Sequence, residues 1–226
     1  MDGRIFGSPP IYYLKEGFAL AQTMDYPAKI QLFRQGTLVD SVYTVVSGII
    51  KLSCVDLEGK EIIVGLRSSG WLLGATSFIL NQPHQTTATT LTRCQLARIS
   101  ANEFGNVLGA ESQFSRYLHA HQAREVEGHL NNLVELASRP TRCRLAKLLS
   151  DVAFGLQSPG SNSIGILKIP LKQWEIAELL AITPEHTCRV LGGLEEAGLV
   201  RREGKHLIIP DLERLLSFAD ADSSAA

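Results

Sequence analysis

The 226-residue sequence has no long apolar run: no stretch approaches the roughly 18 residues that a membrane-spanning helix needs. Its first residues also lack the basic-then-apolar order of a secretory signal. The formal net charge is -1, so the chain as a whole has no electrostatic attraction to nucleic acid. These absences predict a cytoplasmic protein with no membrane partner, and any DNA contact must come from local basic patches.

Cysteine is scarce and scattered. Cys54, Cys94, Cys143 and Cys188 show no CxxC or other metal-type spacing. Isolated thiols are typical of a reducing compartment, so we expect no disulfide framework. A cupin-like, metal-dependent β-barrel enzyme would need several His and carboxylate ligands on its strands, whereas the barrel segment holds only His84. The sequence therefore predicts no metal site, no cofactor and no enzyme activity, with the cupin-like enzyme as the alternative from a different class.

Charge is missing from one stretch altogether. GATSFILNQPHQTTATTLT, from Gly74 to Thr92, holds no Asp, Glu, Lys or Arg in 19 residues. In a chain with 20% charged residues, about four would be expected there. Either this stretch is buried strand and loop, or it is a pocket without charge.

From about Lys29 to Ser100, short runs of β-branched and aromatic residues are broken by glycines. DLEGKE predicts a hairpin turn between two of these runs. No helical stripe of useful length interrupts them. This region is typical of a small antiparallel barrel or sandwich.

Residues 101–137 contain good helix formers and no proline, and Pro140 then predicts a break. One helical face would carry Phe114, Leu118 and His121. A second face, in a different register, would carry Val126, Leu130, Leu133 and Ala137. An apolar stripe on a long helix packs on its own domain or pairs with a second copy.

Residues 170–210 predict two short helices followed by two strands. Thr183 can cap the second helix, Pro184 suits its first position, and Glu185 suits the positive end of the helix dipole. At 100° per residue, one side of this helix is core-like and the other is polar. The core-like side holds Thr187, Val190, Leu191 and Leu194, and the polar side holds Glu185, Cys188, Arg189, Gly192 and Glu196.

This layout is typical of a helix-turn-helix that reads the major groove. An Arg can pair with guanine there, and a Glu can accept a hydrogen bond from cytosine. GLVRREGKHLIIP would add a basic wing suited to phosphates. The alternative is an exposed Glu–Arg pair on an ordinary helical hairpin. The predicted DNA-binding residues are Thr183, Glu185, His186, Cys188, Arg189, Lys172, Arg201 and Lys205.

Three stretches carry a resemblance to a known family: FRQGTLVDSVYTVVSGIIKL, DLEGKEIIVGLRSSGWLLG and TPEHTCRVLGGLEEAGLV. In this order they resemble the barrel, the effector-loop approach and the recognition helix of the CRP/FNR family of bacterial transcription regulators. The resemblance implies an α+β fold with an antiparallel β-roll or jelly roll, a long dimerisation helix and a winged helix-turn-helix. The expected domains are a cyclic-nucleotide-binding-like sensor (1–110), the helix (111–137) and the DNA-binding domain (138–226).

The resemblance also implies a homodimer that reads a palindromic operator on double-stranded DNA, works with RNA polymerase and responds to a small-molecule effector. Glu185 and Arg189 fall on the family's base-reading Glu and Arg. Pro184 falls where cyclic-AMP-type members have a further base-contacting Arg. The expected half-site is therefore closer to TTGAT than to TGTGA.

The usual effector is not expected. Cyclic-nucleotide members hold the phosphate with a Glu and an Arg, and a buried anion needs that Arg; both are missing here. The uncharged positions at the corresponding places are Gly74, Ala75, Thr76, Gln85, Thr86 and Thr87, a candidate pocket for a different effector.

Other sensing chemistries in this family leave two alternatives. An FNR-type iron–sulfur cluster needs N-terminal cysteines, and no cysteine precedes Cys54. A haem- or thiol-based sensor on the same scaffold remains an alternative, through His84 or a barrel cysteine for haem and through Cys188 for thiol chemistry.

Overall fold

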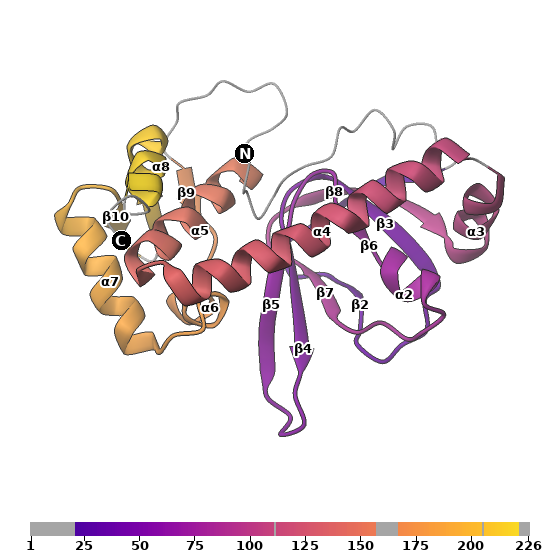
Figure 1. Ribbon diagram of the computed structural model, residues 1–226, viewed down its shortest axis with the longest axis horizontal. Coiled ribbons are helices and arrows are strands. Elements are labelled where there is room, and N and C mark those ends of the chain that lie inside the picture. The colour runs from indigo at the N-terminus through magenta and orange to yellow at the C-terminus, as the bar shows by residue number, and fades with distance from the viewer. Residues whose placement is uncertain (1–20, 111, 157–166, 205, 222–226) are drawn as a thin grey trace. The chain divides into compact units, whose positions relative to one another are not determined.

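The computed structural model describes residues 21–110, 112–156, 167–204 and 206–221. The described chain forms two compact units, the first through Gly128 and the second from His129 onward. The first is built from antiparallel sheets and the second mainly from helices (Figure 1). The predicted α+β architecture is confirmed. None of the helices that the structure describes has the length and apolar character needed to span a bilayer.

The first unit contains two four-stranded antiparallel sheets, with strand orders β1-β8-β3-β6 and β2-β7-β4-β5. Short runs of β-branched residues form these strands because alternate side chains can face the core between the sheets. The strands are β1 (Gln22–Tyr26), β2 (Gln31–Phe33), β3 (Ser41–Ser47), β4 (Ile50–Val55), β5 (Glu61–Arg67), β6 (Leu72–Leu73), β7 (Thr87–Thr90) and β8 (Cys94–Ser100).

The predicted hairpin is confirmed as the turn between β4 and β5. The Asp56 carboxylate accepts hydrogen bonds from the backbone N–H groups of Glu58 and Lys60, both at 2.9 Å. Gly59 lies in the left-handed region with φ 81°, which glycine adopts without steric cost.

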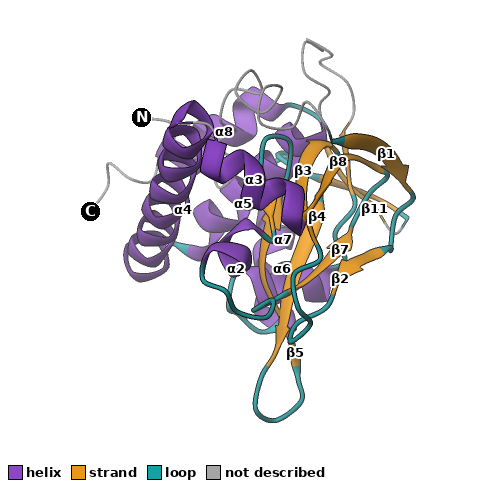
Figure 2. Cartoon of the chain, turned by 90° about the vertical axis from the view of Figure 1, so that its right-hand side faces the viewer, coloured by secondary structure: helices purple, strands orange, loops and turns teal. Residues whose placement is uncertain are grey.

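The helical region that follows contains two helices, α3 (Ala101–Ala110) and α4 (Ser112–Ser138). Figure 2 shows both beside the strands of the first unit. Phe104 of α3 and Phe114 and Leu118 of α4 are buried against β3 and β8. The face predicted from Phe114, Leu118 and His121 is therefore the packed one, because each of these side chains is at most 4% exposed.

The rest of α4 has the opposite character. Its apolar side chains from Val126 to Leu136 are 47–62% exposed, and the sequence places most of them on one face. The four that share this face are called the α4 stripe below: Val126, Leu130, Leu133 and Val134. Long apolar side chains on one helical face are more costly to leave in water than scattered ones.

The second unit contains α5 (Thr141–Leu156), β9 (Leu167–Ile169), α6 (Gln173–Leu179), α7 (Pro184–Glu196), β10 (Arg201–Glu203), β11 (His206–Ile209) and α8 (Leu212–Ala221). The break at Pro140 is confirmed, since α4 ends at Ser138 and α5 begins at Thr141. The three strands form an antiparallel sheet in the order β10-β11-β9. Leu149, Ile176 and Leu191, from three helices, are each at most 1% exposed and form the core.

A tight turn joins α6 to α7. Ala181 takes a left-handed conformation with φ 53°, and the Ile182 N–H donates to the Ala177 carbonyl at 3.0 Å. This turn separates the two short helices that the sequence predicted within residues 170–210. It holds the start of α7 against α6.

Candidate functional site

The N-terminus of α7 is built as predicted. The Thr183 hydroxyl accepts a hydrogen bond from the His186 N–H at 3.2 Å, and Pro184 occupies the first turn. The Thr187 hydroxyl donates back to the Thr183 carbonyl at 3.1 Å. A capped first turn is rigid, so side chains that leave it keep a defined direction.

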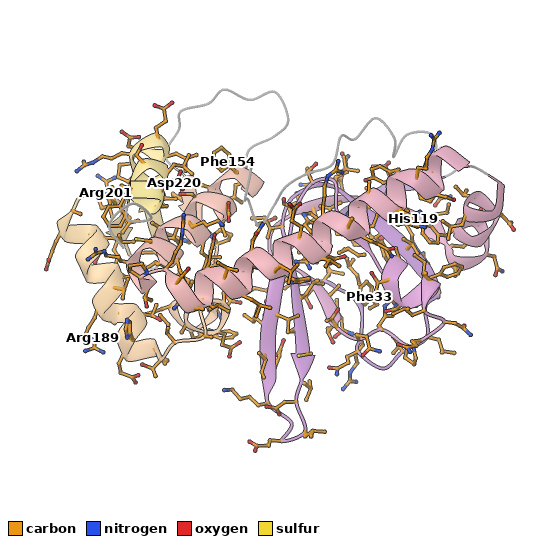
Figure 3. The ribbon with its side chains drawn as sticks, viewed as in Figure 1. Phe33, His119, Phe154, Arg189, Arg201 and Asp220 are labelled. Atoms are coloured by element: carbon orange, nitrogen blue, oxygen red, sulfur yellow. The ribbon has the colours of Figure 1, made fainter. Side chains whose placement is uncertain are left out.

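The two faces of α7 divide as the sequence predicted. Thr187, Leu191 and Leu194 are buried, whereas Glu185, Cys188 and Arg189 are exposed. Arg189 projects away from the body of the second unit (Figure 3). The structure thus brings a carboxylate, a thiol and a guanidinium together within one turn on a free surface.

The carboxylate on this face is ionised at neutral pH. The Glu185 backbone N–H and then the Thr183 hydroxyl hold the pKa of Glu185 below its ordinary value. An ionised Glu beside the Arg189 guanidinium provides one strong acceptor and one strong donor, which is what base-edge recognition requires.

Lys172 lies at the N-terminus of α6, which touches α7. Its backbone N–H donates to the Glu175 carboxylate at 2.9 Å, and its ammonium lies 6.0 Å from the Trp174 ring centroid. The Gln173 side chain donates to the Pro184 carbonyl at 3.2 Å. Lys172 is exposed, so its charge is available beside the start of α7.

The basic wing is β10 and β11, joined through Gly204 with φ 59°. Arg201 is exposed and forms an ion pair with Glu203 (Figure 3). Arg202 reaches back to Glu195 of α7, with 3.2 Å between its Nε and the carboxylate. Lys205, the other predicted wing residue, lies outside the described residues.

In the first unit, the two segments of the predicted effector pocket lie close to each other. Gly74 caps α2 (Ala75–Ile79) with φ 87°, and a Cβ added there would be 3.2 Å from His84 Cε1. Ala75 is buried and Thr76 is exposed. His84 therefore connects the turn at Gly74 to the loop that leads into β7.

Two of the other pocket candidates form hydrogen bonds with residues of the first unit. Thr87 accepts a hydrogen bond from the Gln35 N–H at 3.0 Å, and the exposed Gln85 side chain donates to the Pro83 carbonyl at 3.2 Å. Thr86 is partly buried. Part of the uncharged stretch is therefore buried core and part is an exposed polar loop, and an effector pocket there stays a prediction.

His84 is packed as a core residue. It is 3% exposed, and its ring stacks on Phe33 with 3.8 Å between centroids and 9° between planes. Its backbone bonds to the loop between β2 and β3: the His84 N–H donates to the Thr37 carbonyl, and the His84 carbonyl accepts from the Gly36 N–H. Burial lowers its pKa, so the ring is neutral at pH 7.

The cysteines and the possible metal ligands are dispersed. Cys94 and Cys143 are buried, Cys54 is partly buried and Cys188 is exposed, and all four are free thiols. Within the described ranges, no group of three or more His, Cys, Asp or Glu side chains could hold a metal ion.

Sequence reasoning missed a buried ionic contact between β5 and α4. The Arg67 side chain is 9% exposed, lies 2.9 Å from the Glu125 carboxylate and stacks over Trp71 with 4.3 Å to the ring centroid. A Cβ at Gly65 would lie 2.9 Å from the Arg67 guanidinium, so that glycine makes the room. A glycine two residues before an Arg in a strand is the only sequence signal, and it is weak.

Two family models match the chain. One, described as a cyclic nucleotide-binding domain, matches residues 23–111, and the other, described as a Crp-like helix-turn-helix domain, matches residues 143–218. The chain is 28% identical over 196 residues to a CRP-like cAMP-activated global transcriptional regulator from Mycobacterium tuberculosis, with 86% of each chain covered. It is 26% identical over 185 residues to the cAMP-activated global transcriptional regulator CRP from Haemophilus influenzae, with 81% of this chain and 82% of the relative covered.

Solved structures share the fold. A CRP/FNR family transcriptional regulator from Thermus thermophilus superposes with a TM-score of 0.71 at 20% identity, over 88% of this chain and 98% of that one. FixK2 from Bradyrhizobium japonicum gives a TM-score of 0.70 at 19% identity, over 88% and 96%.

Proposed function

Because the chain belongs to the CRP/FNR family of transcription regulators, we propose that it binds a palindromic operator as a homodimer in the bacterial cytoplasm and acts on RNA polymerase there. Residues 1–110 would sense an effector, 111–137 would pair two copies, and 138–226 would hold the DNA. The observation that carries this proposal is the exposed face of α7, where Glu185 lies in the capped first turn and Arg189 follows it by one turn.

The contacts to DNA divide into two kinds. Glu185 and Arg189 read base edges in the major groove. Thr183, His186, Lys172 and Arg201 lie around them and approach the phosphates, and Lys205 and Cys188 complete the predicted set. Phosphate contacts fix the position of the unit on the duplex, and the two base contacts supply the sequence preference.

Pairing through α4 supports a palindromic site. The α4 stripe offers exposed Val and Leu side chains along one helical face, and burying it against a second copy removes this surface from water. Two identical units related by a two-fold axis present two copies of α7, which match two inverted half-sites.

The effector is a molecule other than cyclic AMP bound in the usual mode, although the relatives named above are cAMP-activated. Residues 74–92 contain neither the Arg nor the Glu with which cyclic-nucleotide members of the family hold the phosphate. The side chains of Thr76, Gln85 and Thr86 are exposed or partly buried, and they favour a neutral polar ligand.

The decisive experiment replaces Arg189 with alanine. We expect Arg189→Ala to abolish specific binding to an inverted repeat of TTGAT half-sites, because the guanine-reading donor is lost from both subunits. Electrophoretic shifts with excess competitor DNA measure binding, and light scattering measures the dimer. The matched control is Arg116→Ala, which removes the same charge from an exposed position on α4. An Arg189→Ala protein that shifts the repeat at the wild-type concentration contradicts this assignment.

A further inference from the structure

Two consecutive glycines lie within the continuous helix α7. Gly192 and Gly193 lie in the interior of a helix that Thr183 caps and Pro184 initiates. Glycine is the least favourable helix residue after proline because it loses the most backbone freedom on folding. Two adjacent glycines therefore lower the stability of this helix. A requirement for the absence of side chains at these positions would explain why they are present.

Packing inside the chain does not require these glycines. A Cβ built at either one meets no atom within 4 Å. In contrast, a Cβ at Gly48 would lie 2.5 Å from the Arg93 carbonyl, where the fold itself excludes a side chain. Alanine would fit at Gly192 and Gly193 without moving any described neighbour.

The position on the helix indicates what does require them. Gly192 follows Cys188, and Gly193 follows Arg189, each by one turn. Gly193 is exposed and Gly192 is partly buried. At 1.5 Å per residue, Gly192 lies about 10 Å along the axis from Glu185. The major groove is about 12 Å wide, so a helix that places Glu185 over the bases brings this point level with the groove wall.

Two acidic residues limit how far along α7 DNA can lie against the helix. Glu195 and Glu196 follow the glycines, and Arg202 holds the Glu195 carboxylate at 3.2 Å. An exposed Glu196 would repel phosphates. The glycines are therefore the last positions on α7 where DNA can lie against the helix.

We propose that Gly192 and Gly193 form a bare patch of helix backbone on which the sugar–phosphate backbone of DNA rests, and that this patch sets how deeply α7 enters the groove. The inference rests on the proposed DNA-binding function and extends it. Without Cβ atoms, the helix axis approaches the strand more closely, which brings Arg189 within reach of the base edges. These glycines are positioning residues for DNA reading.

The test separates stability from DNA affinity. Gly192→Ala and Gly193→Ala are compared with Gly109→Ala, a helical position in α3 where a Cβ also meets nothing within 4 Å. All three substitutions should raise Tm, by about 2–4 °C each in a chain of this size. Only the two α7 variants should lose DNA affinity, by about tenfold, and Gly192→Leu should lose more than Gly192→Ala.

The loss should be larger on the operator than on nonspecific DNA, because a helix held farther out takes Arg189 away from the base edges while the phosphate contacts of the wing remain. An equal loss on both DNAs would show that the glycines do not set the depth of α7 and would overturn the assignment. Alanine variants that gain stability and bind like the wild type would overturn it as well. A fall in Tm would show that the glycines serve packing within the chain. If the wild type binds no DNA, the proposed function fails first and the inference fails with it.

Discussion

His121 is a buried histidine in a charged neighbourhood. It is 4% exposed, and its ring meets Trp71 edge-on at 5.1 Å and lies 6.2 Å from Tyr117. Burial lowers its pKa most, Glu125 opposes this, and Arg67 and Arg124 add to it. The folded protein therefore holds a neutral ring that the unfolded chain would protonate more readily.

The sign of the pH effect follows from that difference. Below the unfolded-state pKa of about 6.5, the unfolded chain binds more protons than the folded one, so stability falls as pH falls. His84 acts in the same direction, because burial lowers its pKa too. Above about pH 6.5, the contribution of both histidines is fully present.

We expect His121→Phe to flatten this pH dependence, because the replacement ring keeps the packing and cannot be protonated. The difference in Tm between pH 7.5 and 5.5 should shrink relative to the wild type while part of it remains through His84. The control is His119→Gln at an exposed position on the same helix. If His121→Phe and the wild type gave the same pH profile, His121 would not be the source.

At single positions, the sequence predicted contacts between residues that lie a few positions apart in the chain. The Thr183 cap and the outward direction of Arg189 follow from local helix geometry. The Arg67–Glu125 pair spans 58 residues, and it depends on where β5 meets α4. No local pattern contains that information.

At the scale of elements, the two parts of α4 differ in the burial of their apolar faces. Up to His121 its apolar face is buried on the strands of the first unit, whereas the α4 stripe is exposed. The sequence predicted both faces and the register change between them from spacing alone.

A charge in the α4 stripe should separate the proposed dimer. We expect Leu130→Asp to yield monomers in light scattering, because two buried carboxylates would face each other across the pair. Leu130 is 58% exposed, so the change should leave the monomer folded by circular dichroism. Operator binding should fall at least about a hundredfold, since a monomer reads one half-site.

The matched control is Asn131→Asp, which adds the same charge on another side of the helix. It should remain a dimer and bind DNA normally. A Leu130→Asp protein that stays dimeric would show that the copies pair through a different surface.

At the scale of the whole molecule, the order of barrel, helix and winged helix-turn-helix was predictable because each part has its own period and turn chemistry. The effector was not. Residues 74–92 exclude charged ligand contacts, yet Gly74 and His84 pack against each other in a way that only the folded chain reveals. Composition shows what a pocket lacks more readily than what it holds.

Cyclic AMP should leave the thermal stability of this protein unchanged. A ligand that binds the native state stabilises it by RT ln(1 + [L]/Kd) and so raises Tm as its concentration increases. This chain offers no Arg in residues 74–92 for the phosphate. The positive control is the cAMP-activated relative from Mycobacterium tuberculosis, measured alongside by differential scanning fluorimetry. A saturable rise in Tm would refute the expectation.

If two copies pair through the exposed α4 stripe as proposed, the amount of operator-binding dimer depends on the concentration of this protein in the cell. While paired copies are the minority, their number rises with about the square of the total, because association is bimolecular. Doubling the total concentration of the protein would then roughly quadruple the number of dimers, which are the species that can bind both half-sites. With such pairing, a regulated gene would respond more steeply than linearly to the concentration of the protein, and dilution during cell growth would lower operator binding without any ligand.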